Sequence, residues 1–233
     1  MKSTKMITAI LACTQTALLA NGLLVDSQNK MRNAKQLFTT ILRNKNTSLV
    51  DYRKATDSIA SILACEAMDH IALKKVTAQT QLAPFVGLEF DTNVVLVPIL
   101  RSGLCLLPTF LRYFETARVD FVGLARDEQT AQAHWYYKNF GTLTGNEYII
   151  ILDPMLATGG TAVEVLRKLK TSGANMDKII FVSVVCAPDG IEKIKTEFPN
   201  VKIITVSVDT HLNDKKFIVP GLGDFGDRYF GTE

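Results

Sequence analysis

The chain has few cysteines, and their spacing excludes two common kinds of site. The four cysteines lie far apart, at Cys13, Cys65, Cys105 and Cys186, and no C-x-x-C pair occurs. That spacing argues against the usual zinc and redox motifs. Isolated cysteines in apolar surroundings behave as small hydrophobic residues and are typical of reducing compartments, so we expect a cytoplasmic location.

The sequence also lacks long apolar runs and a strong charge of one sign. No stretch of about 18 apolar residues occurs, so we predict no transmembrane helix and no membrane partner. The apolar segment 6–24 is interrupted by threonine and glutamine, which favours a packing helix over an export signal. The net charge of +3 does not by itself indicate a nucleic-acid partner. Residues 1–60 hold nine Lys and Arg against three Asp, which a solvated helix face explains most simply.

Proline is absent before Pro84, and the first part of the chain has the periodicity of helices. Segments 33–44 and 51–76 space their apolar residues three and four apart. Ser48 or Asp51 is in position to cap the second of these helices. We therefore predict a helical N-terminal part over residues 1–75.

From residue 93 onward, β-branched runs alternate with helical segments. The runs predict buried strands over 93–100, 119–125, 148–153, 178–187 and 201–208. Most are separated by segments of helical periodicity, which are 103–114, 161–172 and 189–197. Apolar strands that alternate with helices are typical of a mostly parallel sheet covered on both faces. The prediction is one α/β domain over residues 1–233.

Two segments do not follow this alternation. Residues 126–147 are polar, aromatic and long, and they include Trp135, Tyr136 and Tyr137. We expect this segment to form a protruding arm that closes over a site or contacts a second subunit. The glycine-rich tail 209–233 is expected to contain neither a helix nor an ordinary strand.

One predicted strand ends in an acid that precedes a loop of small residues. Asp153 stands at a carboxyl end, where open parallel sheets bind their ligands. Backbone N–H groups suited to an anion then follow at Ala157, Thr158, Gly159, Gly160 and Thr161. Thr161 and Glu164 have capping-box spacing, which indicates a helix start. Because a carboxylate accepts from hydroxyls and repels phosphate, the pattern indicates a ribose 5-phosphate site. A tight turn with a solvated aspartate is the alternative.

Two rival phosphate motifs are excluded. No G-x-x-x-x-G-K-[ST] run occurs, so the chain has no P-loop. The segment GLGDFG (221–226) has the letters of a dinucleotide fingerprint, but only seven residues follow it. That leaves no room for the helix and the later acid that a dinucleotide site requires.

The segment IILDPMLATGGTA (150–162) resembles the phosphoribosyl-diphosphate motif of type I phosphoribosyltransferases. Its Asp-Pro pair is similar to that of the uracil phosphoribosyltransferase family. Further segments resemble that family in the same order: LVPILRSGL (96–104), ARDEQT (125–130), VVCAPDGI (184–191) and FIVPGLGDFGDRYFGT (217–232). The resemblance covers about residues 30–233, and the tail segment is its most specific part.

This resemblance implies a fold, a reaction and partners. The fold is that of type I phosphoribosyltransferases, with an arm over 126–147 and a base-binding hood over 209–233. The reaction transfers the phosphoribosyl group of 5-phospho-α-D-ribose 1-diphosphate (PRPP) to uracil, giving UMP and diphosphate. Mg²⁺ is expected to bind with the diphosphate, without direct protein ligands. A homodimer or homotetramer is implied, some relatives respond to GTP, and nucleic acid is not an expected partner.

The resemblance also assigns site residues. PRPP would contact Arg101, Arg126, Asp153, Pro154, Met155, Leu156, Ala157, Thr158, Gly159, Gly160, Thr161 and Asp224. The two arginines would pair with diphosphate oxygens and stabilise the charge of the leaving group. They are therefore predicted to be catalytic, together with Asp224. Asp224 would either take the proton from N1 of the base or hold a water on magnesium, and both roles remain open.

Uracil would contact the tail, at Ile218, Gly223, Asp224 and Phe225. Two positions depart from the family pattern, because Phe225 stands where a small residue is common and Phe217 where Tyr is common. A ring at Phe225 is expected to crowd the pocket or to stack on the base. Two alternatives follow: a phosphoribosyltransferase with altered base preference, and a pyrimidine-responsive RNA-binding regulator on the same fold.

Overall fold

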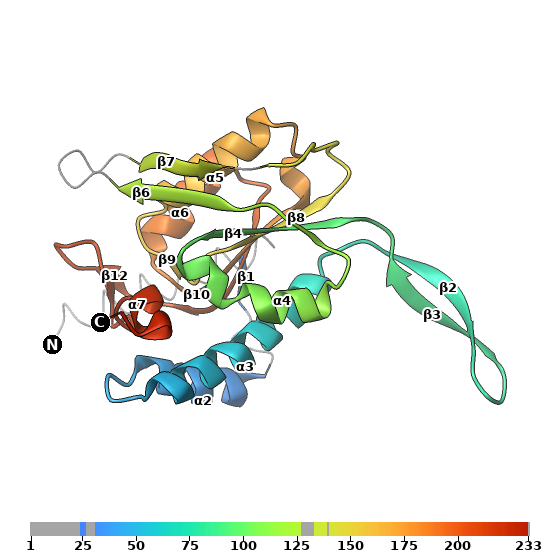
Figure 1. Cartoon of the computed structure of the whole chain (residues 1–233), viewed down its shortest axis with the longest axis horizontal. Coiled ribbons are helices and arrows are strands. Elements are labelled where there is room, and N and C mark those ends of the chain that lie inside the picture. The colour runs from blue at the N-terminus through green and yellow to red at the C-terminus, as the bar shows by residue number, and fades with distance from the viewer. Residues whose placement is uncertain (1–23, 27–30, 127–132, 139, 233) are drawn as a thin grey trace, which may run out of the picture.

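A computed structural model of the chain describes residues 24–26, 31–126, 133–138 and 140–232 (Figure 1). Within those residues the central sheet has the order β1-β11-β10-β8-β4-β6-β7, with β5 beside β4 and β9 beside β10. All paired neighbours in it are parallel except β6 and β7. The predicted mostly parallel sheet is therefore confirmed.

The strands of this sheet are β1 (Leu24–Asp26), β4 (Val94–Leu100), β5 (Arg118–Val119), β6 (Val122–Arg126), β7 (Ala133–Lys138), β8 (Tyr148–Leu152), β9 (Met155–Leu156), β10 (Ile179–Cys186) and β11 (Lys202–Val208). Two small antiparallel sheets consist of β2 (Leu73–Gln79) with β3 (Pro84–Phe90), and of β12 (His211–Leu212) with β13 (Ile218–Val219). The helices are α2 (Arg32–Arg43), α3 (Leu49–Met68), α4 (Leu107–Tyr113), α5 (Gly160–Thr171), α6 (Pro188–Glu197) and α7 (Phe225–Phe230), with 3-10 turns η2 (Ser102–Cys105) and η3 (Met176–Lys178).

Helices cover both faces of the sheet, with α2, α3 and α4 on one side and α5 and α6 on the other (Figure 1). Successive strand side chains point to opposite faces. In β8, Ile150 and Leu152 join the core under α3, while Ile149 and Ile151 join the core under α5. This two-sided burial explains why the strands are continuous apolar runs rather than alternating patterns.

The prediction for the N-terminal part is confirmed in its helices and wrong at its ends. Both predicted helices form, as α2 and α3, and the Ser48 hydroxyl caps α3 by accepting from the Asp51 N–H. However, β1 pairs with β11, and β2 begins at Leu73 as one strand of a hairpin. Strand pairing decides these segments, with a distant strand for β1 and with the adjacent hairpin strand for β2, and the helical periodicity does not report it. Residues 1–23 lie outside the described residues.

The predicted arm over 126–147 is described only in part, since residues 127–132 and 139 lie outside the described residues, and it stays a prediction. Within it Ala133–Lys138 form the strand β7, which pairs antiparallel with β6. The β2–β3 hairpin, for which no projection was predicted, projects from the body in Figure 1. The prediction for the tail needs correction. The tail was expected to lack helix, yet it contains α7, whose first turn is capped by the Asp224 side chain. A six-residue helix is too short to show a period, so the cap was its only local signal.

Candidate active site

The carboxyl ends of β4 and β8 lie side by side and bring two predicted site residues together. Pro98 of β4 is in register with Leu152 of β8, so Arg101 and Asp153 follow at the same edge of the sheet. The Ser102 hydroxyl donates to Asp153 Oδ1 at 3.3 Å. Ser102 was not predicted as a site residue, although it belongs to the quoted segment LVPILRSGL. It links the arginine loop to the acid.

The first half of the phosphate loop is fixed to the sheet through its backbone. The Pro154 carbonyl accepts from the N–H groups of Val184 and Val185, at 2.9 and 3.1 Å. Residues of β9 then pair with β10, so Met155 and Leu156 continue the sheet rather than leaving it. Asp153 Oδ1 also accepts from the Met155 N–H at 3.5 Å. The carboxylate is thereby oriented by its own loop.

The second half of the loop opens onto the start of α5. Gly159 has φ +73°, and a Cβ there would lie 2.9 Å from the Gly190 carbonyl oxygen. It is the N-cap of α5 and forms no side-chain cap. The first N–H groups of a helix have no intrahelical acceptor, so this end of α5 favours an anion. The Gly160 N–H donates to Thr158 Oγ1 at 3.4 Å.

The predicted capping box at this helix is wrong. The helix begins at Gly160, which places Thr161 within the first turn instead of at the cap. Glu164 pairs with Arg167 at 2.5 Å. Gly159 has no side chain that could cap the turn, and the hydrogen bond from the Gly160 N–H to Thr158 Oγ1 is 3.4 Å long. A hydrogen bond of that length is weak, so it competes less with a bound phosphate than a capping box does.

Arg101 is exposed at this edge and pairs with an acid of the tail. Its side chain is 61% exposed, and Nη2 lies 3.0 Å from Asp227 Oδ1 on α7. A hydrogen bond from Thr232 lowers the pKa of Asp227, and Arg101 lowers it further. Asp227 was not predicted as a site residue, and its only sequence signal was a charge within the tail motif. An exposed pair of this kind exchanges readily for another anion.

The predicted uracil-binding residues lie in the tail, around a short turn that precedes α7. Asp224 is exposed, and its Oδ1 accepts from the Asp227 N–H at 2.9 Å. Ile218 is buried, and Gly223 has φ +84°. Together with Phe225 they place several backbone groups and one carboxylate on the same loop.

The expectation for the Phe225 ring is wrong. The ring is 1% exposed and packs edge-on against Tyr52 of α3, with ring centroids 5.3 Å apart. A ring held in the core can neither stack on a base nor narrow a pocket for it. What Phe225 can offer a ligand is its backbone, so it gives no reason to expect altered base preference.

The tail and the phosphate loop meet over η2. Burial raises the pKa of the Cys105 thiol to about 12, and the carboxylates of Asp153 and Asp224 add to that rise. Both acids therefore act on one buried thiol. A Cβ built on Gly226 would lie 3.8 Å from Cβ of Ser102, which places the start of α7 against the same turn.

The remaining predicted residues are described only in part. Arg126 ends β6, and its side chain lies outside the described residues, as do residues 127–132. Trp135 packs edge-on against Phe140, with ring centroids 6.5 Å apart. Tyr136 and Tyr137 are exposed. The structure therefore leaves both predicted roles of this segment, closure and subunit contact, open.

The chain also matches known proteins in sequence. A sequence profile for the family described as uracil phosphoribosyltransferase matches residues 30–232. The chain belongs to the uracil phosphoribosyltransferase family. This family member is 41% identical over 193 residues to a uracil phosphoribosyltransferase of Salinibacter ruber, a match that covers 83% of the chain and 91% of the relative. It is 39% identical over 193 residues to one of Campylobacter concisus, which covers 83% and 92% respectively.

Solved structures support the same fold for this family member. A protein from Aquifex aeolicus matches with a TM-score of 0.81 at 33% identity, covering 91% of this chain and 99% of that one. An adenine phosphoribosyl transferase from Trypanosoma brucei matches with a TM-score of 0.52 at 13% identity, covering 82% and 84%. The second match shows the shared fold alone, which is the predicted type I phosphoribosyltransferase fold.

Across the described ranges, no helix is both long and apolar enough to cross a membrane. In the same residues, no three His, Cys, Asp or Glu side chains gather as a metal site.

Proposed function

We propose that the chain transfers the phosphoribosyl group of PRPP to uracil, giving UMP and diphosphate. The observation that carries this proposal is the meeting of three parts at one sheet edge: Asp153, the start of α5 after Gly159, and the tail turn before α7, which packs against Ser102 beside Asp153. Relatives named uracil phosphoribosyltransferase, at 39–41% identity over most of the chain, support uracil as the base.

The phosphate loop would bind the ribose 5-phosphate. Backbone N–H groups of residues 157–161 would donate to the 5-phosphate, helped by the positive end of the α5 dipole. Asp153, oriented by Ser102 and Met155, would accept from the ribose hydroxyls. The adjacent Pro154 contributes no second carboxylate, so Asp153 has the main role at the sugar.

The arginines would bind the diphosphate. Arg101 would leave Asp227 and pair with diphosphate oxygens, and Arg126 would provide a second guanidinium. Both would stabilise the negative charge that grows on the leaving group, while the sugar passes through an oxocarbenium-like state. Exclusion of water by neighbouring loops would protect that state.

The tail would bind the base. Backbone groups of Ile218, Gly223 and Phe225 would satisfy the carbonyl and N–H groups of uracil. One oxygen of Asp224 caps α7, which holds the carboxylate in a fixed orientation. Asp224 would then take the proton that N1 of uracil loses as the glycosidic bond forms.

The carboxylates at this edge suit magnesium carried by the substrate. Mg²⁺ prefers oxygen ligands and keeps several waters, so the diphosphate with one or two nearby carboxylates suffices. Asp153 beside Ser102 and Asp224 at the start of α7 are the acids that would accept hydrogen bonds from its waters. When bound, the ion would neutralise charge on the departing diphosphate.

Free thiols at Cys65, Cys105 and Cys186 suit the reducing cytoplasm.

The projecting hairpin supports a homodimer or homotetramer. It exposes large apolar side chains at Leu73, Leu82, Phe85, Val86 and Leu88. Val86 and Leu88 share one face of β3, and such exposed patches mark protein contacts. Val86→Glu with Leu88→Glu should lower the mass measured by light scattering to that of a monomer. Glu89→Gln, on the other face, should leave it unchanged. A native chain that is already monomeric would refute the proposal.

A base panel tests the proposed reaction. PRPP, Mg²⁺ and one base are mixed with the protein, and diphosphate release is followed with and without GTP. Release is expected with uracil, and not with hypoxanthine, guanine or orotate. A lack of release with every base refutes the enzyme. Tight RNA binding that weakens steeply with salt would then favour the regulatory alternative.

A further inference from the structure

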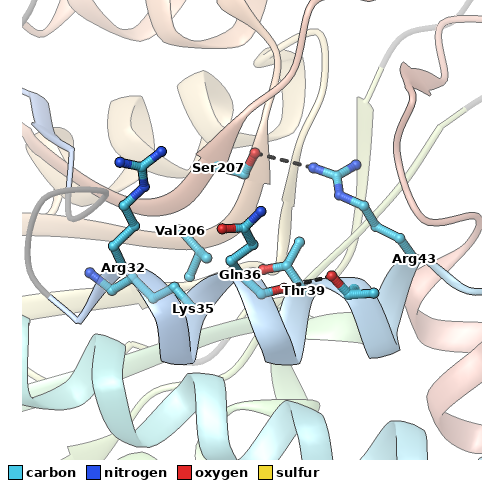
Figure 2. Close-up of a pocket in the computed structure, with 8 residues that line it drawn as sticks. Arg32, Lys35, Gln36, Thr39, Arg43, Val206 and Ser207 are labelled. Atoms are coloured by element: carbon cyan, nitrogen blue, oxygen red, sulfur yellow. Dashed lines mark hydrogen bonds between the residues drawn. The ribbon is translucent and has the colours of Figure 1, made fainter.

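The last residue of α2 reaches across to the base-binding tail. Arg43 donates through Nη1 to Asp209 Oδ2 at 2.7 Å and through Nη2 to Asp209 Oδ1 at 2.5 Å. Nη1 also donates to the Gly221 carbonyl at 2.7 Å, and Nη2 to the Ser207 hydroxyl at 3.1 Å. Figure 2 shows the guanidinium leaving α2 toward Ser207 at the end of β11. A bidentate arginine–carboxylate pair of this kind fixes the orientation of the two side chains as well as their distance.

Asp209 completes the contact from the other side. Its side chain is 3% exposed, and its Oδ2 accepts from the Gly221 N–H at 2.8 Å. Arg43 and Asp209 thus hold both backbone groups of Gly221. Gly221 has φ +59°, and a Cβ there would lie 2.2 Å from the Ile218 carbonyl oxygen. The pair therefore holds a tight turn midway between Ile218 and Gly223.

A second arginine fastens the same turn to α2 from the opposite direction. Arg228 of α7 donates to the Leu222 carbonyl at 2.6 Å, to the Leu42 carbonyl, and to the Asn44 carbonyl at 2.7 Å. Carbonyls at a helix C-terminus have no intrahelical donor, so Arg228 satisfies the end of α2 as it binds the tail. Its guanidinium also lies 4.4 Å from the centre of the Tyr52 ring.

The helix α2 is itself anchored. Lys35 forms a buried ion pair with Glu66 of α3. Lys35 and Arg43 both line a polar cavity of about 410 Å³ between α2 and the end of β11 (Figure 2). Lys35 is paired with Glu66 and Arg43 with Asp209, so these two cations of the cavity wall hold α2 in place. The tail is therefore fixed to a helix that is fixed to the body.

We propose that Arg43 and Asp209 are positioning residues for the base, and that their pair sets the affinity for uracil without setting that for PRPP. This inference rests on the proposed binding of uracil by the tail. The hydrogen bonds of the pair hold the Gly221 turn and reach Ser207 at the end of β11. Loss of the pair should displace Ile218 and Gly223 relative to Asp153 and leave the phosphate loop unchanged.

Steady-state kinetics of the full-length chain test the proposal. Arg43→Gln removes the positive charge and the bidentate guanidinium, and Asp209→Asn removes the negative charge that Arg43 neutralises. Each should raise KM for uracil about tenfold or more, because a turn that is no longer held binds the base less often in the correct geometry. KM for PRPP should stay within about threefold. Arg43→Lys keeps the charge but loses the bidentate guanidinium, so its KM for uracil should lie between those of the native chain and Arg43→Gln.

Two control variants separate positioning from general destabilisation. Ile179→Val shortens a fully buried side chain at the start of β10, far along that strand from the site, and should lower Tm without changing either KM. Arg167→Gln removes an exposed arginine paired with Glu197 on the α5–α6 side and should leave both KM values unchanged.

The outcomes are distinguishable from those of the proposed function. If the native chain releases no diphosphate with uracil, the proposed function fails before any variant is compared. If the native chain is active and Arg43→Gln leaves the uracil KM unchanged, the positioning role is wrong. The positioning role is also wrong if Arg43→Gln raises KM for uracil and KM for PRPP equally. It is likewise wrong if Ile179→Val, which only lowers Tm, raises KM for uracil as much as Arg43→Gln does.

Discussion

The two halves of the site are held in place by different kinds of contact. The 153–161 loop directly follows its strand, and its backbone is bonded to the neighbouring β10. The tail turn 218–223 is held by side chains, namely Asp209 and Arg228 of the tail itself and Arg43 of the remote helix α2. The sugar-phosphate half is therefore held by the backbone of its own sheet, and the base half by side chains that include one from a distant part of the chain. Changes in the two halves should affect the two substrates separately.

The largest expected effect comes from changing the acid of each half, Asp224 in the tail and Asp153 in the loop. Asp224→Asn keeps the shape of the tail but removes the carboxylate that would take the proton from uracil. Turnover should fall by about 10²- to 10⁴-fold, the usual range for loss of a general acid or base. The affinity for PRPP, measured by titration calorimetry, should stay within about tenfold. Because an Asn oxygen still accepts from the Asp227 N–H, the cap on α7 should survive.

Asp153→Asn is the matched change in the other half. It should weaken PRPP binding as well as turnover, since the Asn side chain replaces an acceptor-only carboxylate at the ribose hydroxyls. Full activity of Asp224→Asn would remove the assigned role. An equal loss of PRPP affinity in both variants would show that the halves are not separable.

A pair of glycine variants should give the next largest effects. Gly159→Ala places a Cβ 2.9 Å from the Gly190 carbonyl oxygen, and Gly221→Ala places one 2.2 Å from the Ile218 carbonyl oxygen. Both positions have positive φ, so each change costs about 1–3 kcal/mol of stability. Gly159→Ala should raise KM for PRPP about tenfold, and Gly221→Ala should raise KM for uracil by as much or more.

Gly145→Ala controls for backbone strain alone. Gly145 has φ +78°, and its nearest neighbour for a Cβ is the Gly173 carbonyl oxygen at 3.3 Å, in a loop at the opposite end of β8. It should lower Tm and leave both KM values unchanged. If Gly221→Ala changes KM for PRPP more than KM for uracil, the division into two halves is wrong.

The sequence predicts the local half of the site far better than the assembled half. Asp153 at a strand end and the small residues after it are adjacent in the chain, so a strand, an acid and a helix start could be inferred in order. The one error there was the cap, since Thr161 and Glu164 have the right spacing but Gly159 already fills the N-cap position. Spacing alone does not determine which residue begins a helix.

The assembled half left weaker signals. Arg43 stands 166 positions before Asp209, and no local pattern predicts that they pair. The Phe225 ring was expected at the base because its neighbours belong to the binding loop, yet packing against Tyr52 takes it into the core. Strand pairing of β1 with β11 was missed for the same reason. Contacts between distant residues decide all three cases.

The smallest expected effect concerns the contact that joins the halves. Asp227→Asn removes the acid that Arg101 pairs with in the absence of substrate. Because the pair is exposed and Arg101 must exchange it for diphosphate, KM for PRPP should stay the same or fall by up to about threefold. The pKa of Asp227 is lowered in the folded chain, so its stabilising contribution is present at neutral pH and is lost as the pH falls through that lowered value. When the pH is lowered from 7 through that pKa, the Tm of Asp227→Asn should therefore fall slightly less than the Tm of the native chain. A tenfold rise in KM for PRPP would show instead that Asp227 belongs to the diphosphate site and that the tail contributes to both halves.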